Sequence, residues 1–161
     1  MSDEQWMREA LALAREAAAD GEVPIGCVIT AGDRIVGRGR NRRECGKTAL
    51  AHAELEAIGE ACRVLGGWRL WQCTLYVTLE PCPMCAGASL NAQIPRVVWA
   101  APAPKTGAAG SLVDLLHLSG CFQPEVTSGV LGGECAELLT EFFRALRSSR
   151  AEAKKGIIGA L

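Results

Sequence analysis

The segment Pro81-Cys82-Pro83-Met84-Cys85 decides how the middle of this chain folds. It follows Cys73 to Leu79, whose β-branched and aromatic side chains predict a strand. Pro83 suits the first position of a helix, where its missing N–H would have no partner in any case. Cys82 and Cys85 therefore share one face of a first helical turn. The positive end of the helix dipole there favours the thiolates that a metal requires.

A second short segment, His52-Ala53-Glu54, supplies an imidazole and a carboxylate at the start of another predicted helix. One imidazole and two thiols suit Zn²⁺, and a catalytic zinc keeps three protein ligands and one position for water. We therefore predict one zinc ion per chain, held by His52, Cys82 and Cys85. Glu54 is the catalytic residue that would move protons at the activated water. Because His52 and Glu54 are two residues apart, they converge only if His52 lies where the helix is not yet regular.

Two other interpretations of Cys82 and Cys85 stay open on the sequence alone. A Cys-x-x-Cys pair after a strand also occurs in redox proteins of the thioredoxin type, but that leaves His52-Ala53-Glu54 without a role. A structural zinc would need a fourth ligand, for which His117 and Cys73 are candidates without a paired spacing. The presence of both segments together favours the catalytic interpretation.

The composition is that of a single globular domain. With 161 residues, 49% of them hydrophobic and 22% charged, the chain is long enough to bury its own core. No apolar run approaches the ~20 residues that span a bilayer, and the acidic start lacks the features of a signal peptide. We therefore expect a cytoplasmic protein with no membrane partner, in which the eight cysteines stay reduced.

The net charge of −1 hides two basic clusters. Six cations and one acid lie between Arg34 and Lys47, directly before the His52-Ala53-Glu54 segment, and a second cluster runs from Arg144 to Lys155. Either cluster alone could be ordinary solvated surface. The first one leads into the predicted metal site, which favours a polyanionic substrate beside the metal.

The remaining segments predict an α/β protein with a three-layer α/β/α architecture. The expected elements, in chain order, are a helix from Ser2 to about Gly21, strands 25–30 and 34–39, a helix 51–65, a strand 73–79, a helix from Cys82, strands 94–100 and 125–127, and a helix 133–147. This order predicts a central mixed sheet of about five strands with helices on both faces. We expect residues 1–147 to form one domain and residues 148–161 a C-terminal tail that frays.

The chain resembles the tRNA adenosine deaminases of the cytidine-deaminase-like superfamily over nearly its whole length. The matching segments are Glu22–Gly26, Asn41–Arg42, Ala51–Glu54, Leu75–Gly87, Lys105–Ser111 and Glu134–Phe143. The two metal segments form the known H-x-E…P-C-x-x-C signature of zinc-dependent nucleobase deaminases. Lys105–Ser111 and the Phe-Phe pair of the last helix point more narrowly to the tRNA enzymes.

The resemblance implies a cytidine-deaminase-like fold, a homodimer, and conversion of adenosine to inosine at the wobble position of a tRNA anticodon stem-loop. It further implies that the substrate is contacted by Asn41, Ala53, Arg42 and Lys105. Asn41 matches the family position that holds the target nucleoside.

Two segments depart from the family pattern, and two other functions therefore stay open. Ala103 stands where the family commonly has Asp, and Thr48-Ala49-Leu50 replaces a common Asp-Pro-Thr. Both loops are expected to face the RNA. One alternative is a deaminase of free nucleobases or nucleosides of the guanine, cytosine or adenosine type. The other is a non-catalytic, zinc-stabilised RNA-binding module, in which Glu54 would have no use.

Overall fold

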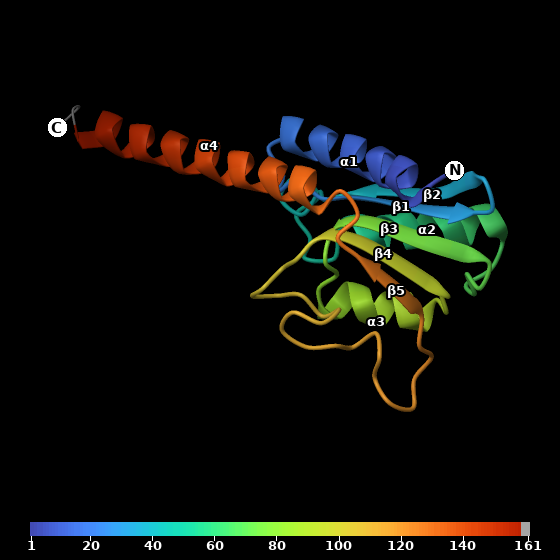
Figure 1. The fold of residues 1–161 in the computed structure, drawn as a ribbon. Helices are drawn as coiled ribbons and strands as arrows, with labels where there is room; N and C mark the ends of the chain where they lie inside the picture. The colour runs from blue at the N-terminus through green and yellow to red at the C-terminus, as the bar shows by residue number, and fades with distance from the viewer. Residues whose placement is uncertain (159–161) are drawn as a thin grey trace.

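The computed structural model describes residues 1–158 of the chain, and its centre is a five-stranded sheet (Figure 1). The strands are β1 (Gly26–Ala31), β2 (Arg34–Arg40), β3 (Cys73–Leu79), β4 (Arg96–Ala101) and β5 (Glu125–Ser128), in the spatial order β2-β1-β3-β4-β5. β1 is antiparallel to both β2 and β3, whereas β3, β4 and β5 run parallel. The predicted mixed sheet is therefore confirmed.

Four helices cover the two faces of this sheet. They are α1 (Asp3–Ala19), α2 (Ala53–Leu65), α3 (Pro83–Asn91) and α4 (Gly132–Ile158). Figure 1 shows α1 and the first turns of α4 above the sheet and α2 and α3 on the opposite side. The three-layer α/β/α architecture expected from the order of the elements is confirmed.

Two hydrophobic cores follow from the alternation of side chains along the strands. Ile29 and Leu75 face α2 and α3, where they pack with Ala57. Their chain neighbours Val28 and Tyr76 point to the other face and belong to the core under α1. Because successive strand residues point to opposite faces, strands covered on both sides must be apolar almost throughout. The helices supply small residues where they lie closest to the sheet.

The close approach of α2 to β2 fixes where α2 begins. Any side chain at Gly39 of β2 would overlap the carbonyl oxygen of Ala53, and one at Gly37 would overlap that of Ala57. Glycine removes the Cβ atom at these two positions, so the helix backbone can lie directly on the strand. The start of α2, with His52 just before it, is held at the edge of the sheet by this contact.

The first helix forms as its sequence predicts. Ser2 caps it, its side chain accepting from the Gln5 N–H while the Gln5 side chain accepts from the Ser2 N–H. The buried residues are those at the predicted helical spacing, namely Trp6, Met7, Ala10, Leu11, Ala14 and Ala17.

The end of α4 differs from the prediction. The helix does not stop near Arg147 but continues to Ile158, and every residue from 148 to 158 is exposed. Apolar periodicity predicts a helix only where one of its faces packs against the protein, and residues 148–158 have no packed face. Alanine, glutamate, lysine and arginine sustain a helix by intrinsic propensity without packing. Residues 159–161 of the expected tail lie outside the described part of the chain, and the domain boundary at 147 stays a prediction. Between residues 1 and 158, no helix combines the length and apolar character needed to cross a bilayer.

Candidate metal centre

The topology of the sheet brings the two predicted metal segments together. β2 and β3 are each antiparallel to β1, so they run parallel to one another and end at the same edge of the sheet. α2 follows β2, α3 follows β3, and both helices pack on the same face. Their N-termini therefore meet at one place. His52 is the N-cap residue of α2 and Cys82 that of α3, and both have extended backbone angles.

The three predicted ligands form a compact cluster whose spacing suits zinc. The Nδ1 atom of His52 lies 3.6 Å from the sulfur of Cys82 and 3.5 Å from that of Cys85. A tetrahedral zinc, with bonds of about 2.3 Å to sulfur and about 2.0 Å to nitrogen, separates those two ligands by about 3.5 Å. One imidazole and two thiols thus fit this metal and leave its fourth position for water.

A fourth protein ligand is not part of this cluster. Within residues 1–158, the side chains close enough to share a metal ion are His52, Cys82 and Cys85 alone. His117 instead contacts Asp114, with 2.8 Å between Nδ1 and Oδ2, and Cys73 is buried in the core under α2 and α3. The arrangement is therefore that of an open catalytic site and not of a closed structural one.

The N-terminus of α3 favours the thiolate form of Cys82, which is the form that binds a metal. The thiol of Cys85 donates to the Cys82 sulfur, and the backbone N–H groups of Cys85 and Met84 also point at it. Against the opposing effect of burial, these contacts lower the pKa of Cys82 to about 5. The same proton raises the pKa of the buried Cys85. Binding of a metal must release this shared proton, which couples metal affinity to pH.

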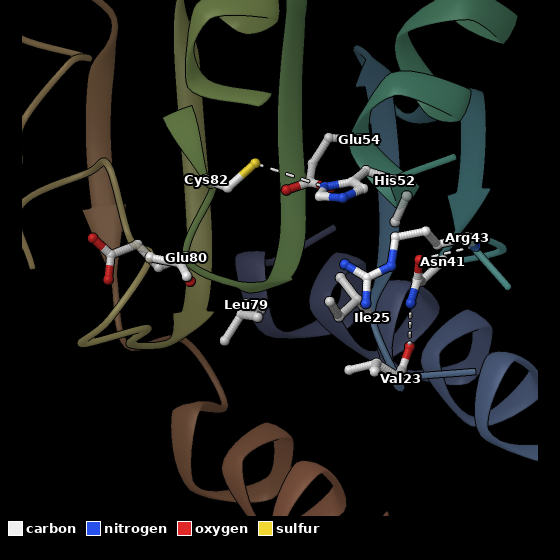
Figure 2. A pocket seen from close by; sticks show the side chains of 11 residues that line it. Val23, Ile25, Asn41, Arg43, His52, Glu54, Leu79, Glu80 and Cys82 are labelled. Atoms are coloured by element: carbon white, nitrogen blue, oxygen red, sulfur yellow. Dashed lines mark hydrogen bonds between the residues drawn. The ribbon is translucent and has the colours of Figure 1, made fainter. Parts of the chain in front are cut away.

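Glu54 lies beside the ligands without belonging to them. Its side chain is only 4% exposed, on the first turn of α2, and it faces the same cavity as His52 and Cys82 (Figure 2). Burial raises the pKa of this carboxyl, and the neighbouring Cys82 thiolate adds to the effect. A carboxyl whose pKa is shifted towards neutrality is suited to accept a proton and return it.

A cavity of about 230 Å³ opens onto the metal cluster and Glu54. Figure 2 shows its walls, lined by Val23, Ile25, Asn41, Arg43, His52, Ala53, Glu54, Leu79, Glu80, Cys82 and Thr106. Apolar side chains from three different segments line it together with polar groups, of which Asn41, Arg43 and His52 come from the segment before α2. Such a slot suits a flat base, which can be held between apolar walls and oriented by a few polar atoms.

Two of the four predicted substrate residues line this cavity. Asn41 is 5% exposed; its Nδ2 donates to the Val23 carbonyl at 3.2 Å, and its Oδ1 accepts from the Arg43 N–H at 3.3 Å. Ala53 lies beside His52 in the same wall. Arg42 and Lys105 are not among the lining residues. The Nε atom of Arg42 pairs with Glu56 at 2.9 Å, and Lys105 is exposed.

Three polar residues that border the cavity are not among the predicted site residues. Arg43 faces it in place of its neighbour Arg42, and Thr106 does so in place of Lys105. Glu80 lies between β3 and the cysteine pair. A carboxylate directly after a buried strand is the sequence feature that could have indicated a role for this residue. For the two loop residues no sequence pattern distinguishes a residue that faces the cavity from its neighbour.

The basic cluster before α2 is partly neutralised in the structure. Arg40 pairs with Glu16 at 2.6 Å and with Asp20 at 3.0 Å, and Arg42 pairs with Glu56. Arg40 thus joins the end of β2 to α1 and the residue that follows it, and Arg42 joins the loop to α2. Among the six cations of the cluster, Arg43 is the one that lines the cavity.

Comparison with known proteins assigns the family. Residues 1–101 match the family model of the cytidine and deoxycytidylate deaminase zinc-binding region. The chain belongs to the cytidine and deoxycytidylate deaminase family. The predicted superfamily and the predicted zinc cofactor are thereby confirmed, and the thioredoxin-type interpretation of the cysteine pair is wrong.

Individual members of the deaminase family are similar over most of the chain. A tRNA-specific adenosine deaminase of Bacillus subtilis is 47% identical over 156 residues, covering 96% of this chain and 97% of the relative. A structure from studies of A-to-I editing by tRNA:A34 deaminases at the wobble position superposes with a TM-score of 0.80 and 42% identity, covering 83% and 98% of the two chains. A guanine deaminase from Nitrosomonas europaea superposes with a TM-score of 0.76 and 26% identity, covering 88% and 84%.

Proposed function

We propose that this chain is a tRNA adenosine deaminase, which hydrolyses the wobble adenosine of an anticodon stem-loop to inosine and ammonia. The observation that carries the proposal is the cavity in which a zinc-type ligand set and a buried carboxyl face one base-sized slot. The similarity to a tRNA-specific adenosine deaminase over 96% of the chain supports the choice of substrate.

The proposed mechanism assigns a separate task to each residue. When bound by His52, Cys82 and Cys85, zinc supplies a water whose pKa falls from 15.7 towards ~7. Glu54 would take one proton from that water and deliver it to a ring nitrogen of adenine, while the remaining hydroxide adds to C6. It would then take the proton from the oxygen now bound to C6 and pass it to the amine, which leaves as ammonia when the C6–N bond breaks. Its buried position favours the protonated form and so holds the proton between these two transfers. A base seated against the apolar side chains of Val23, Ile25 and Leu79 would displace water from the cavity.

Asn41 and Arg43 are proposed to orient the substrate at the mouth of the cavity. The Asn41 side chain is fixed by its bonds to the Val23 carbonyl and the Arg43 N–H, so its remaining lone pair and N–H can be offered to the nucleoside. The Arg43 guanidinium, with the exposed Lys47 and Lys105 on neighbouring loops, would contact phosphates. The target base must be unpaired to enter, which an anticodon loop allows.

The homodimer remains a proposal carried by the family resemblance, and the cytoplasmic location one carried by the sequence features described above. Sedimentation velocity at micromolar concentration should give a mass of two chains. A monomer that deaminates RNA at full rate would contradict the dimer.

A deaminase of free bases is the second candidate, because the Nitrosomonas guanine deaminase shares this fold. The two candidates differ in their response to salt. Three phosphate contacts on a single strand cost roughly 20-fold in affinity between 50 and 200 mM salt, and a free base makes none. Inosine formation on an anticodon stem-loop should therefore fall steeply with salt. Ammonia release from guanine or adenosine, with no activity on any tRNA, would favour the second candidate. Inactivity on all substrates would favour the RNA-binding module.

A further inference from the structure

The carboxylate of Glu80 makes a set of contacts that the deamination chemistry does not need. The side chain is 2% exposed, and within the described residues 1–158 its hydrogen bonds all come from one loop, residues 103–111. Its Oε2 accepts from the Ala103 N–H at 3.0 Å, and its Oε1 accepts from the Ala109 N–H at 3.1 Å and the Ser111 N–H at 2.9 Å. The Ser111 hydroxyl donates to Oε2 as well. Figure 2 shows this carboxylate turned away from His52 and Cys82, so it does not face the metal.

The loop is wrapped tightly around this carboxylate. A Cβ atom at Gly107 would overlap the carboxyl group of Glu80, so only glycine lets the loop backbone lie against it. The loop is also closed on itself, since the Gly107 N–H donates to the Ala103 carbonyl at 2.7 Å. A second anchor joins the loop to the residue after Glu80, where the Ala108 N–H donates to the Pro81 carbonyl at 2.8 Å. The loop therefore takes its shape from the segment that leads into Cys82.

The same loop forms part of the substrate cavity. Thr106 lines the cavity directly, and the exposed Lys105 precedes it. The contacts of Glu80 lie on both sides of these two residues, at Ala103 before them and at Ala109 after them. Loss of the hydrogen bonds between Glu80 and this loop would thus shift the cavity wall at Thr106 without displacing a candidate metal ligand.

We propose that Glu80 is a positioning residue that holds the 103–111 loop in the shape required to bind the RNA substrate. The proposal rests on the proposed function for the identity of the substrate, while the positioning itself is independent of it. The group must be a carboxylate, because both oxygens face only N–H and O–H donors. Glutamine has the same shape, but its NH₂ group would leave at least one backbone N–H without an acceptor. In the Oε2 position it would face the Ala103 N–H, while the Ser111 hydroxyl could rotate to accept, and in the Oε1 position it would face the N–H groups of Ala109 and Ser111.

The test compares zinc-loaded wild-type protein with Glu80→Gln and Ser111→Ala. Glu137→Gln, the same change at an exposed acid of α4, is the matched control. Losing hydrogen bonds to a charged acceptor should raise KM for an anticodon stem-loop about 10-fold, with kcat changed far less. Ser111→Ala removes one donor and keeps the three backbone donors, so its effect should be smaller. Zinc content should stay at the wild-type level in all variants.

Limited trypsin digestion supplies a readout that does not depend on activity. The peptide bond after Lys105 lies in the held loop, so Glu80→Gln should be cut there about 10-fold faster than wild type, and Glu137→Gln at the wild-type rate. A Glu80→Gln protein with unchanged KM and unchanged cleavage would overturn the proposal. Loss of zinc in that variant would also overturn it, since Glu80 would then act through the ligands. If Glu80→Gln does not fold, KM and the rate of cleavage after Lys105 are measured for Ser111→Ala instead, and unchanged values of both would overturn the proposal.

The failure of this proposal is distinguishable from failure of the proposed function. If the wild-type protein deaminates no tRNA, the substrate assignment is wrong, and cleavage after Lys105 still decides whether Glu80 positions the loop. If the wild type deaminates tRNA and Glu80→Gln behaves like it in KM and cleavage, only the role of Glu80 is wrong.

Discussion

Cys82 and Cys85, the two thiols proposed to hold the metal, lie on one helical turn, and Cys82 is the more exposed of the two. Replacing Cys82 by serine substitutes a hard hydroxyl for the soft thiolate that zinc prefers. We expect Cys82→Ser to lose most of its zinc, as measured by elemental analysis of protein purified without added metal. The exposed Cys121 is the matched control, and Cys121→Ser should keep one zinc per chain. Full retention of zinc in Cys82→Ser would remove this thiol from the ligand set.

The sequence allowed prediction of the three candidate ligands, of Glu54, and of Asn41 and Ala53, but not of the other residues that line the cavity. The ligands could be found because His-x-Glu and Cys-x-x-Cys spacings at helix starts bring side chains together through local geometry alone. Arg43, Thr106 and Glu80 could not be found in this way. Which residue of a loop faces inward depends on hydrogen bonds from distant segments, such as those that join Glu80 to Ala109 and Ser111.

The start of α1 is fastened to the sheet by a forked ion pair. The two terminal nitrogens of Arg96 on β4 each lie 2.8 Å from one carboxylate oxygen of Asp3, and the Tyr76 hydroxyl donates to Asp3 at 3.0 Å. The hydrogen bonds from Arg96 hold the pKa of the Asp3 carboxyl below its ordinary value. An ion pair therefore adds to the hydrophobic contacts that hold α1 against the sheet.

This ion pair predicts a pH dependence of stability with a defined sign. Because the folded pKa of Asp3 is lowered, its contribution is fully present above the unfolded value near 3.9 and is lost as pH falls through the folded value. Asp3→Asn should lower the free energy of unfolding at pH 7 by at most about 1 kcal/mol, since the pair is partly exposed. In urea titrations from pH 7 to 3, the difference from wild type should shrink below about pH 4. Glu9→Gln, at an exposed position of α1, should show no such trend. A difference that stays constant over this range would contradict the account.

The helices and strands were predictable where packing imposes a period on the sequence. The first helix and β3 follow their expected bounds because each presents apolar side chains to a core at regular spacing. Residues 148–158 of α4 have no such period, since all of them are exposed, and the sequence did not predict that they are helical. The order of the strands in the sheet could not be predicted from the sequence either, because it depends on pairing between segments far apart in the chain.

The molecule consists of a packed body and the exposed end of α4, which extends away from it (Figure 1). Residues 148–158 bury no apolar side chain, so a chain that ends at Arg147 should keep its zinc and its melting temperature, within about 2 °C. Its far-UV circular dichroism should lose the helix of the removed turns. A fall of the melting temperature by many degrees would show that the domain extends beyond residue 147.

The whole fold serves to place two helix N-termini against one cavity. β2 and β3 run parallel because β1 lies between them and is antiparallel to both, and α2 and α3 therefore begin side by side. These two helix starts bring together His52, Cys82 and Cys85, which we propose hold the metal, and Glu54 lies beside them on the first turn of α2. The central claim is that this site deaminates adenosine in RNA through Glu54.

The measurement that tests this claim most directly is inosine formation on a tRNA anticodon stem-loop by wild-type protein and by Glu54→Gln, with zinc determined in the same samples. The carboxylate moves protons and does not hold the metal, so both proteins should contain one zinc per chain. The wild type should convert the wobble adenosine, and Glu54→Gln should be slower by ~10²-fold or more, as expected for lost acid–base catalysis. Equal rates for the two proteins, or no inosine from a zinc-loaded wild type on any tRNA, would contradict the account.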